Sequence, residues 1–403
     1  MEPKIRLKGF SGDWEDTTIG NIATVVGGGT PSTINPLYWN GPIQWFTPSE
    51  VGHTKYVEKS ERTITKDGID GSSARIIPAN SLLLSSRATI GEASINICEC
   101  TTNQGFQSLV PINVDLEFLY SLMITKKSDL LRESNGSTFL EISASKVKSI
   151  DICVPEKNEQ QALGSYFQHL DSLIQSTTKK IESLKQVKAA SLQSMFPQEG
   201  ETTPRVRFKG FEGEWENKTL GECLTINNER NQSNVYGIND VLSVSDEVGV
   251  VNQIKLLGRS YAGKSVANYR VLKTNQIVYT KSPLKSKPYG IVKVNKGAVG
   301  IVSVLYAVYD ANENVYPDYI HYYFEPTHRI NNYLLPLISK GAKNTMNISD
   351  EMALTGNIWI PSLEEQQKIA GFFQALDIQI TLQSQRLEKL KQIKAACLDN
   401  MFV

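Results

Sequence analysis

The chain has 403 residues, 40% of them hydrophobic, which is enough for two or three domains with cores of their own. Its 42 basic and 42 acidic residues balance, so the overall charge does not point to a nucleic-acid partner. No apolar run reaches the roughly 18 residues of a membrane span, and the start MEPKIRLK lacks the apolar stretch of a signal peptide, so we expect a cytoplasmic protein. Five cysteines without a CxxC pair and four scattered histidines predict neither a disulfide framework nor a metal site.

Two repeats frame each half of the chain. PKIRLKGFSGDWEDTTIG starts at Pro3 and PRVRFKGFEGEWENKTLG starts at Pro204, a shift of 201 residues. A longer pair occupies residues 154–197 and 360–403, with a constant shift of 206 and no gap. The segments between these repeats show almost no such similarity. The pattern predicts a duplicated frame that holds two different inserts, an arrangement suited to two separate binding specificities.

The first insert, residues 23–150, is rich in turn and hydrogen-bonding residues. GGGTPST at 27–33 and YWNGPIQWFTPSE at 38–50 combine glycines, prolines and aromatic residues suited to a concave surface. Arg, Asn and Gln side chains pair bidentately with purine edges in the major groove of DNA. Asn and Gln equally satisfy backbone groups in loops, so a purely structural role stays open. The candidate DNA-contacting residues of this insert are Arg87, Asn103, Gln104, Gln107, Ser137 and Thr138.

Residues 154–197 and 360–403 each predict one long helix. Hydrophobic residues of the first copy alternate spacings of four and three, the pattern of a coiled coil. Each helix is expected to run about 38 residues, or roughly 57 Å. A stripe this narrow needs a partner, and we expect the other copy, paired antiparallel, because short connections are favoured. The stripe consists of Leu163, Phe167, Leu170, Ile174, Thr177, Ile181, Leu184, Val187, Leu192 and Met195, and it recurs 206 residues later.

Polar residues mark particular positions of these helices. Thr177 and the matching Gln383 lie in the hydrophobic stripe, where a polar residue either fixes the register or has no such role. Ser362, three residues before Glu365, predicts a capping box. The first copy has Glu156 in place of Ser362, so a weaker cap is expected there.

The second insert carries a long basic run. Residues 252–309 contain no Asp or Glu but ten basic side chains, and four of the tyrosines in this range stand between the basic residues. Such a local field attracts phosphates even in a neutral chain, although a solvated basic sheet face is the alternative. The loop from Lys281 to Pro288 is too irregular for a core strand and too basic to be buried, so its lysines are predicted phosphate contacts. The candidate DNA-contacting residues of this half are Lys264, Arg270, Lys281, Lys285, Lys287, Tyr289, Lys343 and Asn344.

Gly258, Gly263, Lys264 and Ser265 match the phosphate-binding pattern G-x-x-x-x-G-K-[ST]. That motif needs a strand before it and a helix after it. VNQIKLL before the match is compatible with a strand, but VANYRVLKTNQIVYT after it also has the β-branched and aromatic residues of a strand. We therefore expect Lys264 to contact DNA phosphates, with a nucleotide-binding enzyme as the alternative.

Motifs for catalysis are missing from the sequence. It contains no Asn/Asp-Pro-Pro-aromatic tetrapeptide of the kind that grips a flipped amino base, and no glycine-rich loop opening a clear Rossmann unit. No nucleophile, histidine and carboxylate form a convincing set. The chain is therefore expected to be non-catalytic and to work with partner proteins.

Four motifs occur once in each half of the chain. They are P-x-x-x-E-Q-Q at Pro155 and Pro361, F-Q-x-L-D at Phe167 and Phe373, L-K-Q-[VI]-K-A-A at Leu184 and Leu390, and R-[LF]-K-G-F-x-G-x-W-E at Arg6 and Arg207. With these motifs the chain resembles, over nearly its whole length, the specificity subunit of type I restriction-modification systems. The two inserts resemble two different types of target recognition domain.

The resemblance implies an α/β fold with an internal pseudo-twofold repeat. Target recognition domains are expected at residues 1–153 and 204–359, separated by helices at 154–197 and 360–403 that pair as an antiparallel coiled coil, with 198–203 as a linker. Such a chain binds a bipartite DNA sequence, one half-site per domain.

The resemblance also implies partner proteins. Two methyltransferase subunits would carry S-adenosylmethionine and methylate a flipped-out adenine in each half-site. Restriction subunits would cleave unmodified DNA with ATP and magnesium. No cofactor is expected in this chain itself. The methyltransferase is expected to dock near the helix starts, at Gln160, Gln161, Gln366 and Gln367. A scaffold that holds two proteins without binding DNA is the remaining alternative.

Overall fold

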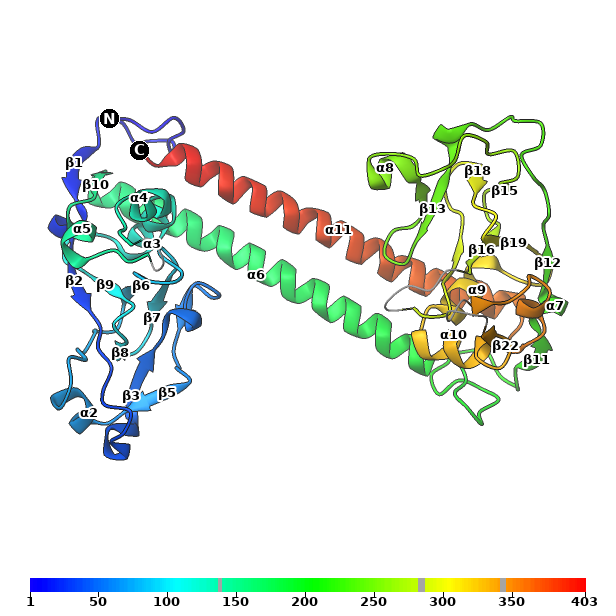
Figure 1. Cartoon of the computed structure of the whole chain (residues 1–403), viewed down its shortest axis with the longest axis horizontal. Coiled ribbons are helices and arrows are strands. Elements are labelled where there is room, and N and C mark those ends of the chain that lie inside the picture. Colours follow the sequence, from blue (N-terminus) through cyan, green and yellow to red (C-terminus); the bar gives the residue numbers. More distant parts are fainter. Residues whose placement is uncertain (137–139, 282–286, 341–345) are drawn as a thin grey trace. The chain divides into compact units, whose positions relative to one another are not determined.

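The computed structural model describes residues 1–136, 140–281, 287–340 and 346–403. The chain divides into two compact units, unit 1 (Met1–Lys179 with Ser384–Val403) and unit 2 (Lys180–Gln383), and each is described by itself. Two long helices, α6 (Lys157–Ser194) and α11 (Leu363–Met401), contribute one part to each unit (Figure 1). Among the described residues, no helix is both long and apolar enough to cross a membrane.

Unit 1 is built around a mixed five-stranded sheet. Its strands, in order, are β2 (Ala23–Gly27), β9 (Gln107–Pro111), β6 (Ser81–Leu84), β7 (Ala93–Asn96) and β4 (Tyr56–Val57), with only β4 parallel to its neighbour. A second sheet places β3 (Trp39–Phe46) between β5 (Arg62–Ile64) and β8 (Cys100–Thr102), and β1 (Glu15–Thr18) pairs with β10 (Asp151–Val154). The shorter helices are α1 (Ile19–Ile22), α2 (Lys66–Asp70), α3 (Leu116–Thr125), α4 (Lys127–Arg132) and α5 (Ala144–Lys148), with 3-10 turns η1 (Pro36–Tyr38) and η2 (Pro48–Glu50).

Unit 2 repeats the central order of this sheet. Its four antiparallel strands are β12 (Leu224–Ile226), β19 (Tyr306–Ala311), β16 (Ile277–Thr280) and β17 (Val292–Val294), equivalent in chain order to β2, β9, β6 and β7. Four further pairs are β11 (Glu216–Thr219) with β22 (Asn357–Ile360), β13 (Leu242–Ser245) with β14 (Gly249–Asn252), β15 (Arg270–Leu272) with β18 (Gly300–Val302), and β20 (Ser339–Lys340) with β21 (Met346–Asn347). The shorter helices are α7 (Leu220–Cys223), α8 (Gln253–Leu257), α9 (Pro317–Phe324) and α10 (Thr327–Leu334), with 3-10 turns η3 (Ile238–Asp240) and η5 (Met352–Leu354).

Aromatic rings from both long helices close the core of each unit. In unit 1, Phe402, just after α11, has its ring centroid 5.6 Å from that of Phe167 in α6. In unit 2, Phe196, which follows α6, lies 6.0 Å from Phe373 in α11. In each unit the end of one helix therefore lies beside the start of the other, which confirms the predicted antiparallel pairing.

The long helices have 38 and 39 residues, as the heptad pattern predicts. Most of the first stripe is buried or half-buried, but Val187 is 48% exposed, so the expectation that it continues the stripe was wrong. A helix with 3.6 residues per turn drifts away from a 3.5-residue pattern, which moves late positions off the contact face. The hydroxyl of buried Thr177 donates to Leu173 O at 2.7 Å within its own helix, so it does not fix the register by a hydrogen bond to α11.

The cap of α11 is half of the predicted capping box. Ser362 Oγ accepts a hydrogen bond from Glu365 N at 3.4 Å, as predicted. The Glu365 carboxylate does not return to the cap, because it is bound by Arg207 instead. The sequence pattern therefore located the helix start correctly but missed the second partner of its glutamate.

Candidate DNA interface

One arginine-to-glutamate contact ties the opening repeat to a long helix in each unit. Arg6 donates from Nε and Nη2 to the Glu159 carboxylate at 2.9 and 2.8 Å. Arg207 donates to Glu365 at 2.7 Å from both equivalent nitrogens. The side chains of Glu159 and Glu365 are only 2% and 1% exposed, so each buried negative charge depends on its arginine. These contacts explain why the two repeats recur together.

The glutamines expected to dock partner proteins fall into two classes. Gln160 accepts a hydrogen bond from Asp115 N at 3.0 Å, and Gln366 accepts one from the equivalent backbone amide of unit 2 at 2.8 Å. Both side chains are buried, so they hold the helix starts and, contrary to expectation, present little surface to a partner. Gln161 and Gln367 are exposed, and for them docking stays a prediction.

Two matching ion pairs join the long helices. Lys394 of α11 lies 2.6 Å from Asp171 of α6 in unit 1, and Lys188 of α6 lies 2.7 Å from Asp377 of α11 in unit 2. The four residues belong to the repeated F-Q-x-L-D and L-K-Q-[VI]-K-A-A motifs. Asp171 also lies 3.0 Å from Lys55 of the first insert, and Asp377 accepts a hydrogen bond from a tyrosine of α9 at 2.9 Å. Asp171 of α6 therefore connects α11 with the first insert, and Asp377 of α11 connects α6 with the second insert.

Three loops of unit 1 meet at one end of the strands of its five-stranded sheet. The glycine run after β2 reaches the β8–β9 turn, where Gly29 N donates to Thr102 O at 2.9 Å. A Cβ atom on Gly28 would collide with the backbone of Asn103, so this approach requires glycine. The β6–β7 loop joins the same turn through a 2.7 Å hydrogen bond from Ser86 N to a backbone carbonyl. The predicted irregular segments thus form one loop cluster.

The amide candidates of the first insert lie in this cluster but differ in their contacts. Asn103 Oδ1 accepts a hydrogen bond from Gly105 N at 2.8 Å and shapes the turn. Gln104 is exposed and accepts one from Thr30 at 2.5 Å. The Oε1 atom of Gln107 is buried and has no hydrogen-bond partner. The structural alternative applies to Asn103, whereas base contact stays a prediction for Gln104 and Gln107.

Arg87 lies in the β6–β7 loop beside the segment that precedes α5. Its Nη2 donates to Glu141 Oε1 at 2.7 Å, and the two residues also form a backbone bridge. Their side chains are 43% and 42% exposed, so the pair lies at the surface. Arg87 is therefore an accessible but already partnered candidate.

The basic run of unit 2 is largely paired with carboxylates from outside the run. Its acidic partners come from segments before and after residues 252–309, which the acid-free sequence concealed. The paired side chains are Arg270 and Lys281 with Asp350, Lys273 with Glu229, Lys287 and Lys293 with Asp246, and Lys296 with Asp318. Much of the predicted positive field is therefore neutralised within the unit.

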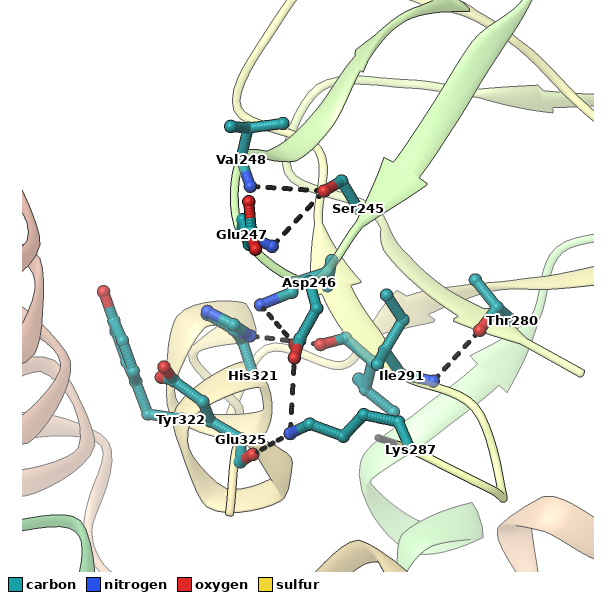
Figure 2. Close-up of polar contacts among 12 residues, drawn as sticks. Ser245, Asp246, Glu247, Val248, Thr280, Lys287, Ile291, His321, Tyr322 and Glu325 are labelled. Carbon is teal, nitrogen blue, oxygen red and sulfur yellow. Dashed lines mark hydrogen bonds and ion pairs between the residues drawn. The ribbon is translucent and has the colours of Figure 1, made fainter. Parts of the chain in front are cut away.

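Lys287 departs most from the prediction. It was expected to be too basic to be buried, yet it is only 7% exposed. Its Nζ donates to the Glu325 carbonyl at 2.5 Å and lies 3.8 Å from the Asp246 carboxylate of the β13–β14 hairpin (Figure 2). Burial lowers the pKa of the neighbouring Lys293, which shares the same carboxylate at 3.5 Å. The hairpin covers these lysines, so the prediction of Lys287 as an open phosphate contact was wrong.

Arg270 and Lys281 converge on one buried carboxylate. Arg270 opens β15 and its Nη2 lies 2.5 Å from Asp350 Oδ2, while Lys281, directly after β16, pairs with the other oxygen. Burial alone would raise the pKa of Asp350, but hydrogen bonds from Lys281 and Arg270 outweigh it and hold the pKa below its ordinary value. Nε and Nη1 of Arg270 are buried without a hydrogen-bond partner. Two cations thus share one anion here.

Lys264 is exposed, but its surroundings do not form a phosphate-binding loop. The preceding residues 253–257 form the short helix α8, and not the strand with which their sequence was compatible. Asn252 caps this helix, and Gly258 ends it with φ +76°. The following residues lead into strand β15, as expected. Without a helix after it, the match lacks the positive helix end that would hold phosphates.

The remaining candidates divide between described and undescribed residues. Tyr289 is half-buried and its carbonyl accepts a hydrogen bond from Tyr279 at 2.9 Å. Ser137, Thr138, Lys285, Lys343 and Asn344 lie outside the described residues. Sequence reasoning missed Glu141, Asp246 and Asp350, because isolated acidic residues carry no motif that shows which distant cation they meet.

Comparison with known proteins agrees with the repeated architecture. The sequence profile of the type I restriction modification DNA specificity domain matches residues 11–186 and 212–392. The chain is 34% identical over 246 residues to the type I restriction enzyme MjaIX specificity subunit of Methanocaldococcus jannaschii, covering 56% of this chain and 55% of that protein. It is 33% identical over 175 residues to the EcoR124I/EcoR124II specificity subunit of Escherichia coli, covering 41% and 43%. The chain thus matches about half the length of these relatives.

Solved structures share the fold at low sequence identity. The type I restriction-modification S subunit from M. genitalium superposes with a TM-score of 0.61 at 15% identity, covering 100% of this chain and 99% of that one. A chain from a structural study of complex assembly in the type I system gives a TM-score of 0.52 at 14% identity, covering 98% and 99%. These likenesses extend over both units and both long helices.

Proposed function

Because the chain belongs to the type I restriction modification DNA specificity family, we propose that it is the DNA-recognition subunit of a type I restriction-modification complex. The observation that carries the proposal is one frame used twice with two different inserts. The Arg6 and Arg207 contacts are alike, and the central sheets have the same strand order. The strands and loops around those sheets differ, as expected for two units that read two different half-sites.

Each unit would meet DNA through the loops at the ends of its sheet. The exposed candidates of unit 1 are Arg87 and Gln104. In unit 2, Lys255, Arg259 and Lys264 are exposed cations between β14 and β15. Side chains of this kind contribute phosphate contacts that position the protein and base contacts that specify sequence.

Chemistry would reside in partner proteins. Two methyltransferase subunits would dock at the long helices, near Gln161 and Gln367, and methylate a flipped-out adenine in each half-site. S-adenosylmethionine, and ATP and magnesium for cleavage by restriction subunits, would bind those partners. This chain would be non-catalytic, and the missing helix after Lys264 gives no support to a nucleotide-binding enzyme.

The deciding experiment is to co-express the chain with its methyltransferase subunit and map methylated adenines in the host DNA by long-read sequencing. We expect one bipartite motif with a fixed spacer. Replacing residues 23–150 with the matching insert of a related subunit should change one half of that motif only. A complex that binds no DNA in a gel shift would instead support a protein-clamping scaffold, and a change in both halves would contradict separate reading.

A further inference from the structure

Both units place a carboxylate against the cation that follows the same strand of the repeated sheet. In unit 1 the strand is β6, the cation is Arg87 and the carboxylate is Glu141. In unit 2 the equivalent strand is β16, the cation is Lys281, and the carboxylate is Asp350. The inserts share almost no sequence, so this agreement comes from the fold and not from a repeated motif.

The carboxylates also occupy equivalent places in the chain. Glu141 lies between α4 and α5, shortly before β10, and Asp350 lies between α10 and η5, shortly before β22. Each therefore belongs to the segment that returns from the insert to the frame. Hydrogen bonds fix this segment: Glu141 N and O both bond to the Asn135 backbone at 2.9 Å, and the Asp350 carbonyl accepts a hydrogen bond from Tyr309 at 3.3 Å.

The paired arginines retain hydrogen-bond donors that the protein does not use. Arg87 donates a hydrogen bond from Nη2 to Glu141, while its Nε is buried without a hydrogen-bond partner. Arg270, which shares Asp350 with Lys281, has two such nitrogens, Nε and Nη1. A buried donor without an acceptor is costly, but DNA does not reach a buried nitrogen. The groups open to DNA are the 43%-exposed side chain of Arg87 and the 22%-exposed side chain of Lys281.

We propose that Glu141 and Asp350 are equivalent positioning residues, which orient Arg87 in unit 1 and Lys281 in unit 2 toward the DNA half-site of their own unit, while the buried Arg270 holds Asp350 in place. The proposal rests on the proposed function. A long basic side chain loses much rotamer freedom when it binds, and a carboxylate that fixes it beforehand reduces that loss. Such a residue acts on recognition without touching DNA.

The charge balance predicts a different effect in each unit. Arg87 and Glu141 form a neutral, half-exposed pair, so Glu141 is expected mainly to orient an arginine for base contact. In unit 2, two cations face one carboxylate, and the surplus positive charge suits a phosphodiester. Loss of Glu141 should therefore affect base discrimination most, and loss of Lys281 should affect salt dependence most.

The test uses the complex of the full chain with its methyltransferase, measured against matched and single-mismatch duplexes at two salt concentrations. Glu141→Gln should lower discrimination at one half-site by at least about fivefold and leave the other unchanged. Glu133→Gln is the control, because it removes a half-exposed ion pair with Lys146 in the same segment. Glu141→Asp, which keeps the charge, should restore part of the discrimination.

In unit 2, Lys281→Gln should reduce the salt slope by roughly one and weaken binding to all sequences alike. Asp350→Asn should lower discrimination at the half-site that Glu141→Gln spares, and its neighbour Glu351→Gln is the exposed control. If Asp350→Asn does not fold, Lys281→Gln still decides the unit 2 arm.

Folded variants with unchanged discrimination and salt slope would overturn the proposal, and so would equal losses at both half-sites. A wild-type complex without affinity for any bipartite duplex would instead refute the proposed function itself. The two failures are therefore distinguishable in the same binding series.

Discussion

Arg6 in unit 1 and Arg207 in unit 2 bind equivalent glutamates, Glu159 and Glu365, at the starts of the two long helices. The charged groups beyond the sheets, by contrast, are arranged differently in the two units. Unit 1 presents Arg87 and Glu141 as a half-exposed one-to-one pair. Unit 2 buries Asp350 between two cations. Sequence repetition therefore marks the contacts that hold each unit to the helices, and sequence divergence marks the surfaces in which the two units differ.

The largest effect is expected from breaking the repeated frame. Arg207→Ala leaves the Glu365 carboxylate buried and unpaired, so unit 2 should lose about 3 to 5 kcal/mol of unfolding free energy, and Arg6→Ala should do the same to unit 1. Chemical denaturation measures the loss. Arg205→Ala, which removes an exposed pair with Glu201, is the control and should cost much less, because water screens an exposed ion pair. If Arg205→Ala and Arg207→Ala lowered the unfolding free energy equally, the buried frame contact would contribute no more to stability than an exposed ion pair.

Acid should separate the two units. Burial, with the nearby Lys293 charge, lowers the pKa of His321 from 6.5 to about 3. The unfolded chain then binds a proton that the folded unit does not, so unit 2 loses stability as pH falls from 6.5 toward 3, by up to about 1.4 kcal/mol per pH unit. Unit 1 has only the exposed His53 and His169. Hydrogen exchange at pH 7 and pH 5 should show earlier opening around α9.

The variant His321→Gln is the control for this acid effect. It removes the titrating group while keeping a side chain that can accept or donate a hydrogen bond near Val292 O. The difference in opening between pH 7 and pH 5 should shrink in this variant. Acid sensitivity that stays unchanged would assign the effect to other groups of unit 2, such as His328, whose pKa is also lowered by burial.

The cross-helix ion pairs should have similar strengths in both units. Double-mutant cycles on Lys188 with Asp377, and on Lys394 with Asp171, are expected to give coupling energies of about 1 kcal/mol each, because these partly buried charges lie within 3 Å. Equilibrium denaturation of the single and double alanine variants provides the values. A coupling found in only one unit would mean that the two units share the geometry of this ion pair but not its contribution to stability.

The smallest effect is expected at the exposed surface of unit 2. Lys264→Ala should change unfolding free energy by less than about 0.5 kcal/mol, while reducing the salt slope of DNA binding by roughly one. Lys287→Ala should behave in the opposite way and lower stability first, because Lys287 is buried against Glu325 and Asp246. Binding titrations at two salt concentrations, with thermal melts, compare the two lysines.

The frame could be predicted from sequence because repetition and heptad spacing are local patterns. Helix lengths, antiparallel pairing and the Ser362 cap followed from them. The partner of Glu365 did not, since Arg207 lies 158 residues away and no local pattern joins them. The helix α8 was missed although Asn252 and Gly258 stand at its two ends, because the β-branched and apolar residues between them also fit a strand.

The site was predicted less completely than the frame. The irregular segments of unit 1 were predicted from their glycines, prolines and hydrogen-bonding residues, but the sequence did not predict that three of them meet. The burial of Lys287 could not be foreseen, because the acid-free run shows which charges it contains and not which distant carboxylates fold against them. Asp246 reaches it from a hairpin 41 residues earlier in the chain. Charge patterning therefore identifies a basic region of the sequence but does not show which of its side chains are exposed.

The packing of Phe402 into unit 1 has a consequence for synthesis on the ribosome. Unit 1 begins with the first residues, yet its core takes Phe402, and Ile5 N bonds to Asn400 O at 2.9 Å. At about 5 to 20 residues per second, the part of α11 that completes unit 1 emerges roughly 10 to 40 seconds after residue 200. Unit 2 needs only residues 180–383. The unit made first is thus finished last, and its aromatic core stays open to chaperones during that interval.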